Sequence, residues 1–281
     1  MSELTEKELF ETVPVPRAVA RLIIPTIISQ IVTVIYNLAD TFFIGQIGDP
    51  AMVAGATLGD LSMTWYTHID PNKTVEICNY LKNHAERGER IFYDIYTDEE
   101  KEADPSLEDT GLFFFRGNRG APFAVTCAGG GFAYVAAMHD SFPHALELSK
   151  RGYNAFAIIY RPGWQTAYRD LARALSFIFE NAAELGIDTG GYSLWGGSAG
   201  ARMAAELGSY GAAEYGGDDL PKPSALVMQY TGYSDYNPEG EPATFVCVGD
   251  WTGLRIGAPC SGVFRRLTRW GFPRNFTSIK A

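Results

Sequence analysis

The chain has 281 residues, which is room for one large α/β domain with an extension. Of these residues 46% are hydrophobic and 20% are charged, a composition that excludes a wholly disordered chain and a coiled coil. Its formal net charge is −10 and it has no cluster of Lys and Arg, which argues against nucleic-acid binding. The four cysteines are scattered without CxxC or Cys/His spacing, so we expect neither a metal site nor a cofactor.

Residues 1–58 differ in character from the rest. After a polar, mostly acidic start, residues 19–48 read VARLIIPTIISQIVTVIYNLADTFFIGQIG, an apolar run at the lower limit for a bilayer-spanning helix. Asp40 would be costly in lipid unless it faced a polar interior. A secretory signal fits poorly, because acidic residues precede the run and no cleavage site follows it. We expect a hydrophobic helix over 17–47, a means of membrane association for an otherwise cytoplasmic protein.

The stretch IPTIISQIVTVIYNLADTFFIGQIGDPAMVAGATL, above all YNLAD (36–40) and FIG (43–45), resembles the first transmembrane helix of the multidrug and toxic compound extrusion (MATE) transporters. The resemblance covers only about residues 14–58, one helix of such a transporter. A single helix cannot form an alternating-access cavity. We therefore interpret 1–58 as a transporter-like segment fused to a second domain, residues 59–281.

The second domain has the pattern of an α/β sheet. Residues 94–109, DIYTDEEKEADPSLED, are so acidic that we expect a solvated loop. Short apolar runs then alternate with helical stretches, which is typical of a mostly parallel, doubly wound sheet. The expected strands are LFFF (112–115), PFAVTC (122–127), NAFAIIY (154–160), YSLWG (192–196), SALVMQY (224–230) and ATFVCVG (243–249), and apolar residues at helical spacing predict a helix within 167–185.

A G-x-S-x-G motif is centred on Ser198, between the expected strand 192–196 and the helix-like stretch ARMAAELG. Small residues also occur in ordinary turns, so the motif alone is a weak signal. In a strand–turn–helix context, however, it is typical of a nucleophile elbow, in which glycines let a tight turn expose the serine oxygen. We predict that Ser198 is a catalytic nucleophile.

A second glycine-rich segment, AGGGF (128–132), follows the expected strand 122–127. Amides of unhindered glycines can approach an oxyanion, and removal of one such donor costs roughly 100-fold in rate. The alternatives are a flexible turn or a dinucleotide site, but the latter lacks its G-x-G-x-x-G spacing and its acidic partner.

The segments GGGFAYVAAMHDSFPHALELSKRGYNAFAIIYRPG and YSLWGGSAGARMAA resemble bacterial α/β-hydrolase esterases, near the feruloyl and acetyl-xylan esterase-like group, over about residues 61–251. The resemblance implies a small-molecule ester substrate, with Ser198 as nucleophile. It also implies that Gly130, Gly131 and the amide of Ala199 form the oxyanion hole.

The rest of the catalytic triad does not follow the family pattern. In this fold the acid and the histidine come after the serine, but all four histidines, His68, His84, His139 and His144, precede it. Asp250 lies near the acid position and is a possible substitute, but the family's aspartate two residues later is replaced here by Thr252.

We hypothesise that a frameshift after Asp250 accounts for this departure. Permitted codons for WTGLRIGAPC, read two bases later, encode DGIANWRTM, and GFPRNFTS likewise yields IPTEFH. Both shifted readings resemble the esterase family at these places. We therefore interpret 252–281 as a frameshifted tail, so that the sheet is C-terminally incomplete.

Three functions remain open. The chain is a serine ester hydrolase impaired by loss of its acid and histidine, a fragment of a MATE transporter, or a catalytically dead α/β-hydrolase-like binding domain. The number of membrane spans separates the first two, and an ester hydrolysis assay separates the first from the third.

Overall fold

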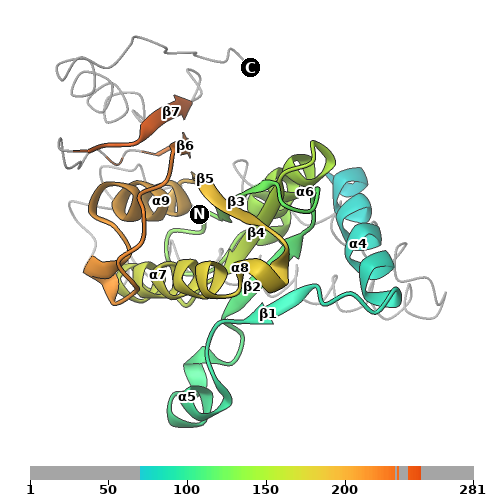
Figure 1. The fold of residues 1–281 in the computed structure, drawn as a ribbon, viewed down its shortest axis with the longest axis horizontal. Helices are drawn as coiled ribbons and strands as arrows, with labels where there is room; N and C mark the ends of the chain where they lie inside the picture. The colour runs from blue at the N-terminus through green and yellow to red at the C-terminus, as the bar shows by residue number, and fades with distance from the viewer. Residues whose placement is uncertain (1–69, 232, 234–239, 248–281) are drawn as a thin grey trace, which may run out of the picture. The chain divides into compact units, whose positions relative to one another are not determined.

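The fold is built around one sheet in the order β1-β2-β4-β3-β5-β6-β7 (Figure 1). The structure is a computed structural model, and it describes residues 70–231, 233 and 240–247. The chain divides into two units, Met1–Val75 and Glu76–Ala281, and all contacts given below lie within the second. The strands are β1 (Phe92–Asp94), β2 (Gly111–Phe115), β3 (Pro122–Cys127), β4 (Asn154–Ile159), β5 (Asp188–Gly197), β6 (Ala225–Gln229) and β7 (Ala243–Cys247).

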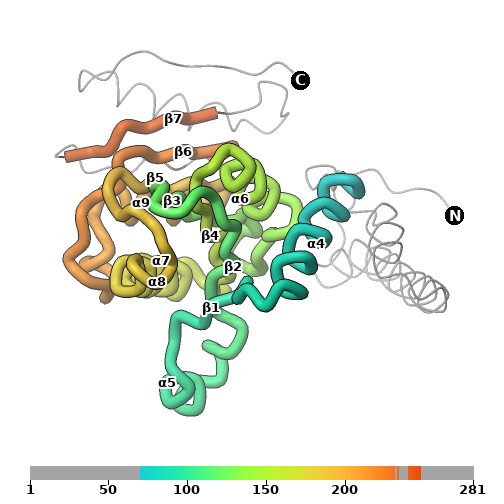
Figure 2. The backbone as a smooth tube through the Cα atoms, turned by 45° about the vertical axis from the view of Figure 1, so that its right-hand side comes forward, coloured from blue at the N-terminus to red at the C-terminus, as the bar shows by residue number. Residues whose placement is uncertain are grey.

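The sheet is mostly parallel, as the sequence predicts. The pairs β3–β4, β3–β5, β5–β6 and β6–β7 are parallel, whereas β2 pairs antiparallel with both β1 and β4. The central strands β3 and β4 are buried along almost their whole length, which is the pattern of strands covered on both faces. Figure 2 shows β5, β6 and β7 side by side beyond this centre.

Helices cover both faces of the sheet. They are α4 (Pro71–Glu86), α5 (Asp98–Ala103), α6 (Ser141–Lys150), α7 (Trp164–Glu180), α8 (Ala182–Leu185) and α9 (Ala199–Tyr210), with short 3-10 turns at η1 (Pro105–Leu107), η2 (Ala137–His139) and η3 (Ala213–Tyr215). In Figure 1, α4 and α6 lie on one side of the sheet, and α7, α8 and α9 on the other.

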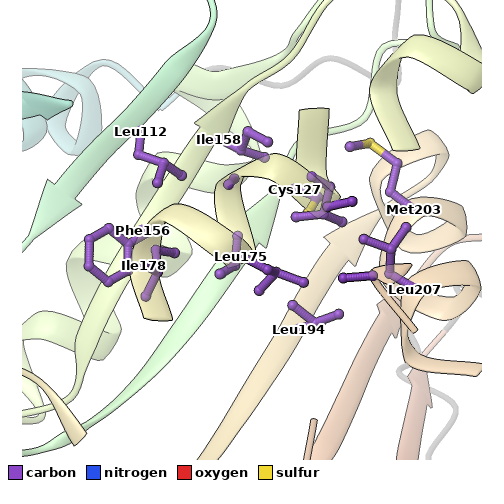
Figure 3. Close-up of a cluster of buried hydrophobic side chains, with 14 of the residues drawn as sticks. Leu112, Cys127, Phe156, Ile158, Leu175, Ile178, Leu194, Met203 and Leu207 are labelled. Carbon is purple, nitrogen blue, oxygen red and sulfur yellow. The ribbon is translucent and has the colours of Figure 1, made fainter. Parts of the chain in front are cut away.

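Side-chain alternation along β4 shows why both faces need a cover. Phe156 and Ile158 pack in the larger core with Leu175 of α7, whereas Ala155 and Ala157 pack in the smaller core beneath α6. Figure 3 shows the larger core, where side chains of α7 and α9 meet those of the central strands. Successive residues of a strand point to opposite faces, so a run without polar residues is buried on both sides.

Two sequence expectations need correction. The acidic stretch 94–109 contains a helix, α5, because Thr97 accepts a hydrogen bond from the Glu100 amide and the Glu100 side chain accepts one from the Thr97 amide. The helix expected within 167–185 is two helices, since α7 ends at Glu180 and α8 follows Asn181.

The N-terminal expectations concern residues outside this description, including the hydrophobic helix over 17–47, the transporter-like stretch 14–58 and the boundary at residue 59. The interpretation of 252–281 and the position of Asp250 lie outside it too. Among the helices that the structure does describe, none combines the length and apolar character needed to cross a membrane.

Candidate active site

Ser198 occupies the tight turn between β5 and α9, where the sequence predicts an elbow. Its backbone has φ 51° and ψ −113°, a conformation that costs a non-glycine residue of order 1–3 kcal/mol and is typically found at functional sites. The Ser198 amide donates to the Gln229 carbonyl at the end of β6, 2.9 Å away. Strand and helix together therefore hold Ser198 at the carboxyl edge of the sheet.

The two flanking glycines of the motif are required by close packing. A Cβ atom on Gly196 would lie 2.2 Å from the carbonyl carbon of Gly200, and one on Gly200 would lie 2.0 Å from the carbonyl oxygen of Cys127. Any side chain at either position would force the start of α9 away from β5 and β3. The G-x-S-x-G spacing is thus the spacing at which the turn closes on itself.

The glycine-rich segment lies beside Ser198 because β3 and β5 are parallel neighbours, with Cys127 opposite Gly196. A Cβ atom on Gly129 would lie 3.1 Å from the Cβ of Ser198. Gly130 and Gly131 have φ values of 131° and 62°, which favour glycine.

Three amides at this edge are available to a ligand. The N–H groups of Gly130, Gly131 and Ala199 donate to no acceptor within the part of the chain that the structure describes. The first amides of a helix, including that of Ala199, have no partner within the helix itself.

Asp140 is a site residue that sequence reasoning missed. Its side chain is 4% exposed, and its Oδ2 atom accepts a 2.5 Å hydrogen bond from the Gly129 amide. The Tyr160 hydroxyl donates to the Ala128 carbonyl at 2.8 Å, so polar side chains hold the glycine-rich segment at two successive residues. A lone aspartate before a helix resembles an ordinary N-cap, which hides this role, but here it makes no capping bond.

The hydroxyl of Tyr230 lies close to the carboxylate of Asp140. The residue is 45% exposed, yet a Cβ atom on Gly197 would meet its hydroxyl at 2.2 Å, so the phenol end lies against the elbow. Burial of the hydroxyl, and then the charge of Asp140, raise the pKa of Tyr230. Tyr230 therefore stays protonated and able to donate a hydrogen bond at neutral pH.

Neither His139 nor His144 forms a hydrogen bond with Ser198 in the described part of the chain. His144 is held by the Asp140 carbonyl at Nδ1 (2.6 Å) and by the Gln229 side chain at Nε2 (3.0 Å), which assigns the proton to Nδ1. Burial lowers the pKa of His139, and no hydrogen bond joins it to Ser198 within the described chain. His84 binds Glu89, and His68 lies outside the described residues.

A small cavity behind the elbow is lined by Asp140, Ser141, His144 and Gln229. Its volume is about 10 Å³, room for about one water molecule, so it cannot hold an ester. The described residues also contain no group of three or more His, Cys, Asp or Glu side chains placed to hold a metal ion.

Comparison with known proteins agrees with this architecture. A family model described as BD-FAE matches residues 116–230, the span that contains the glycine-rich segment and Ser198. No sequence among curated proteins matches the chain.

Solved structures similar to this chain include several hydrolases. An acetyl ester-xyloside bifunctional hydrolase from Caldicellulosiruptor lactoaceticus is 18% identical, with a TM-score of 0.53 over 67% of this chain and 84% of that one. A thermophilic esterase from Thermogutta terrifontis with propionate bound is 16% identical, with a TM-score of 0.54 over 67% and 82%. Esterase B from Lactobacillus rhamnosis is 14% identical, with a TM-score of 0.53 over 74% and 83%. The fold is that of the α/β hydrolases.

Proposed function

We propose that this chain is a carboxylic-ester hydrolase by fold and site, with Ser198 as its nucleophile, whose turnover is impaired because the residues that activate the serine are missing. The observation that carries the proposal is the strained backbone of Ser198 between β5 and α9, beside Gly129. An ordinary strand-to-helix turn has no need of this strain, whereas a nucleophile elbow does.

The chemistry begins with attack of the Ser198 hydroxyl on an ester carbonyl. The negative charge that develops on the carbonyl oxygen is stabilised by the amides of Gly130, Gly131 and Ala199, which the structure leaves without other acceptors. Loss of the alcohol gives an acyl-serine, which water must then hydrolyse. We assign Asp140 the task of holding the glycine-rich segment through the Gly129 amide.

Both steps need a base, and the chain offers none in the usual place. No histidine follows Ser198 in the sequence, and both nitrogens of His144 are occupied. A serine without a base keeps its ordinary weak nucleophilicity, although an oxyanion hole and substrate binding alone can retain roughly 10³–10⁴-fold catalysis over water. We infer slow acylation of Ser198, slower release of the acyl group, and turnover several orders of magnitude below that of an intact esterase.

A peptide map after incubation with p-nitrophenyl acetate tests the proposal. The exposed Ser224, which precedes β6, serves as an internal reference within the same chain. We expect Ser198 to be acetylated roughly 100-fold faster than Ser224, the size of effect that one or more oxyanion donors supply. Equal acetylation of the two serines would show that the elbow provides no oxyanion hole and would refute the proposal.

The nature of the ester is a finer proposal. The Caldicellulosiruptor protein acts on acetyl esters and xylosides by its name, and the likeness of residues 116–230 to BD-FAE points in the same direction as the sequence resemblance. We propose acetyl or feruloyl esters of carbohydrates as the substrate class. The interpretation of the chain as a MATE-family fragment gains no support from the described residues.

A further inference from the structure

A second, larger groove lies apart from the residues of the Ser198 turn. Its volume is about 650 Å³, and its walls include the aromatic side chains of Tyr96, Trp164, Tyr168 and Tyr215. Trp164 is 49% exposed, so much of its side chain is accessible to a ligand in the groove.

One wall of the groove is a face of α7. Five residues of this helix line the groove, namely Trp164, Gln165, Tyr168, Arg169 and Arg173, and spacings of three and four residues place neighbouring members on adjacent turns. The opposite wall comes from the α5 region and from η3, which contribute Glu100 and Glu214.

Sheet topology places this groove at the same edge as Ser198. Because β2 is antiparallel to both β1 and β4, β1 runs in the same direction as β4 and β5. Tyr96, Trp164 and Ser198 each follow one of these strands, so all three leave the sheet at its carboxyl edge, where ligands bind in open α/β sheets.

The groove also contacts the glycine-rich segment. Phe132 accepts a 2.8 Å hydrogen bond from the Gly163 amide through its carbonyl, and its ring meets Tyr168 edge to face with centroids 6.0 Å apart. A ligand seated against Tyr168 would therefore lie next to the segment that carries Gly130 and Gly131.

Tyr168 contributes its ring to the groove, while its buried hydroxyl lies close to Arg202 of α9. Its side chain is 1% exposed, and its hydroxyl has no hydrogen-bond partner of acceptable geometry in the described part of the chain. The nearby Arg202 lowers the pKa of Tyr168, but burial outweighs it and raises that pKa to about 12.

The charges of the groove identify the ligand class. Arg169 and Arg173 are balanced by Glu100 and Glu214, so the lining has no net charge to attract an ion. Arg173 already pairs with Glu100 at 3.6 Å, whereas Arg169 forms no ion pair or hydrogen bond with a described residue. Flat aromatic surfaces beside balanced donors and acceptors suit a neutral ring that carries many hydroxyl groups.

We propose that this groove binds a neutral sugar residue, with Trp164 stacking on the sugar ring and Arg169 donating to its hydroxyls. As a binding site the groove is independent of hydrolysis. The further step, that this sugar is the alcohol part of an ester presented to Ser198, rests on the proposed function.

Titration calorimetry of the full chain with xylotriose tests the binding, and it uses S198A so that hydrolysis plays no part. We expect saturable binding that is weakened about tenfold or more by W164A and severalfold by R169A. The control variant is R151A, which changes an exposed arginine at the C-terminal end of α6. It should bind xylotriose like the parent. Thermal unfolding of each variant checks that it folds.

Each outcome decides the proposal. Failure of xylotriose to bind, or equal binding by S198A, W164A and R169A, overturns it, and so does binding of methyl ferulate in preference to xylotriose, which would make the groove a phenol site. None of these results depends on acetylation of Ser198, so the groove and the proposed hydrolase can fail separately.

Discussion

At the scale of single residues, Gly200 has no room for a side chain. The Cβ atom of G200A would fall 2.0 Å from the Cys127 carbonyl oxygen, which belongs to the rigid centre of the sheet. We expect G200A to lower the free energy of unfolding by about 3 kcal/mol, the upper range for overpacking. Urea unfolding followed by circular dichroism measures the loss.

G208A in the same helix is the matched control. There the nearest atoms, at 2.6 and 2.8 Å, are the methyl groups of Leu226, which belong to a side chain and not to the backbone. Replacement of glycine by alanine inside a helix also gains about 0.5–1 kcal/mol. G208A should therefore lose less stability than G200A, and an equal loss in both variants would contradict the special tightness of the turn at Ser198.

At the scale of elements, Asp170 joins α7 to the ends of two strands. It is fully buried and accepts hydrogen bonds from the Arg161 amide (2.8 Å), the Arg161 guanidinium (2.7 Å) and the Tyr96 hydroxyl (2.7 Å). D170N leaves the Arg161 charge without its buried partner, so we expect a loss of about 3 kcal/mol in the free energy of unfolding.

A surface ion pair provides the comparison for D170N. Lys82 and Glu86 lie 3.9 Å apart, and their side chains are 63% and 64% exposed. Pairs of this kind contribute about 0.5 kcal/mol or less, so E86Q should unfold at nearly the same urea concentration as the parent. If D170N were as mild as E86Q, the Asp170 cluster would not hold these elements together.

Glu241 makes the attachment of β7 to α9 sensitive to pH. The Ser209 hydroxyl donates to both of its carboxylate oxygens, and burial raises the pKa of Glu241 from 4.5 to about 7. The folded state thus binds a proton that the unfolded state has lost, so this group's contribution to stability falls as the pH rises from about 4.5 to 7.

The variant E241Q isolates that contribution. His139, whose pKa is lowered by burial, has the opposite effect below about pH 6.5, and it is present in both proteins. We expect the stability difference between E241Q and the parent to shift in favour of E241Q between pH 5 and pH 7.5, measured by urea unfolding at each pH. A difference independent of pH would contradict the raised pKa.

At the scale of the whole molecule, the sheet could be read from the sequence where strands are long and buried. The expected runs 122–127 and 154–160 correspond to β3 and β4, since a strand covered on both faces is almost entirely apolar and stands out in the sequence. The strand β1 was missed because three residues, one of them acidic, form no recognisable run. The helix α5 was missed although Thr97 and Glu100 have the spacing of a capping box.

The candidate site, too, could be predicted from the sequence only in part. The turn at Ser198 and the glycines 129–131 were predictable because local motifs specify them, and both lie where parallel neighbours β3 and β5 end. Asp140 and Tyr230 meet at the elbow only after the chain has folded, and no spacing in the sequence indicates that contact. The roles of these residues in catalysis remain predictions.

The central claim is that Ser198 lies in an esterase elbow without a base. Its most direct test is the time course of p-nitrophenol release from p-nitrophenyl acetate. We expect a slow release of about one equivalent per chain followed by a near halt, because the acyl-serine forms with help from the oxyanion hole but has no base to assist its hydrolysis. The variant S198A should show no such release. Sustained rapid turnover that S198A abolishes would reveal a working base, and identical release by S198A and the parent would remove Ser198 from the chemistry altogether.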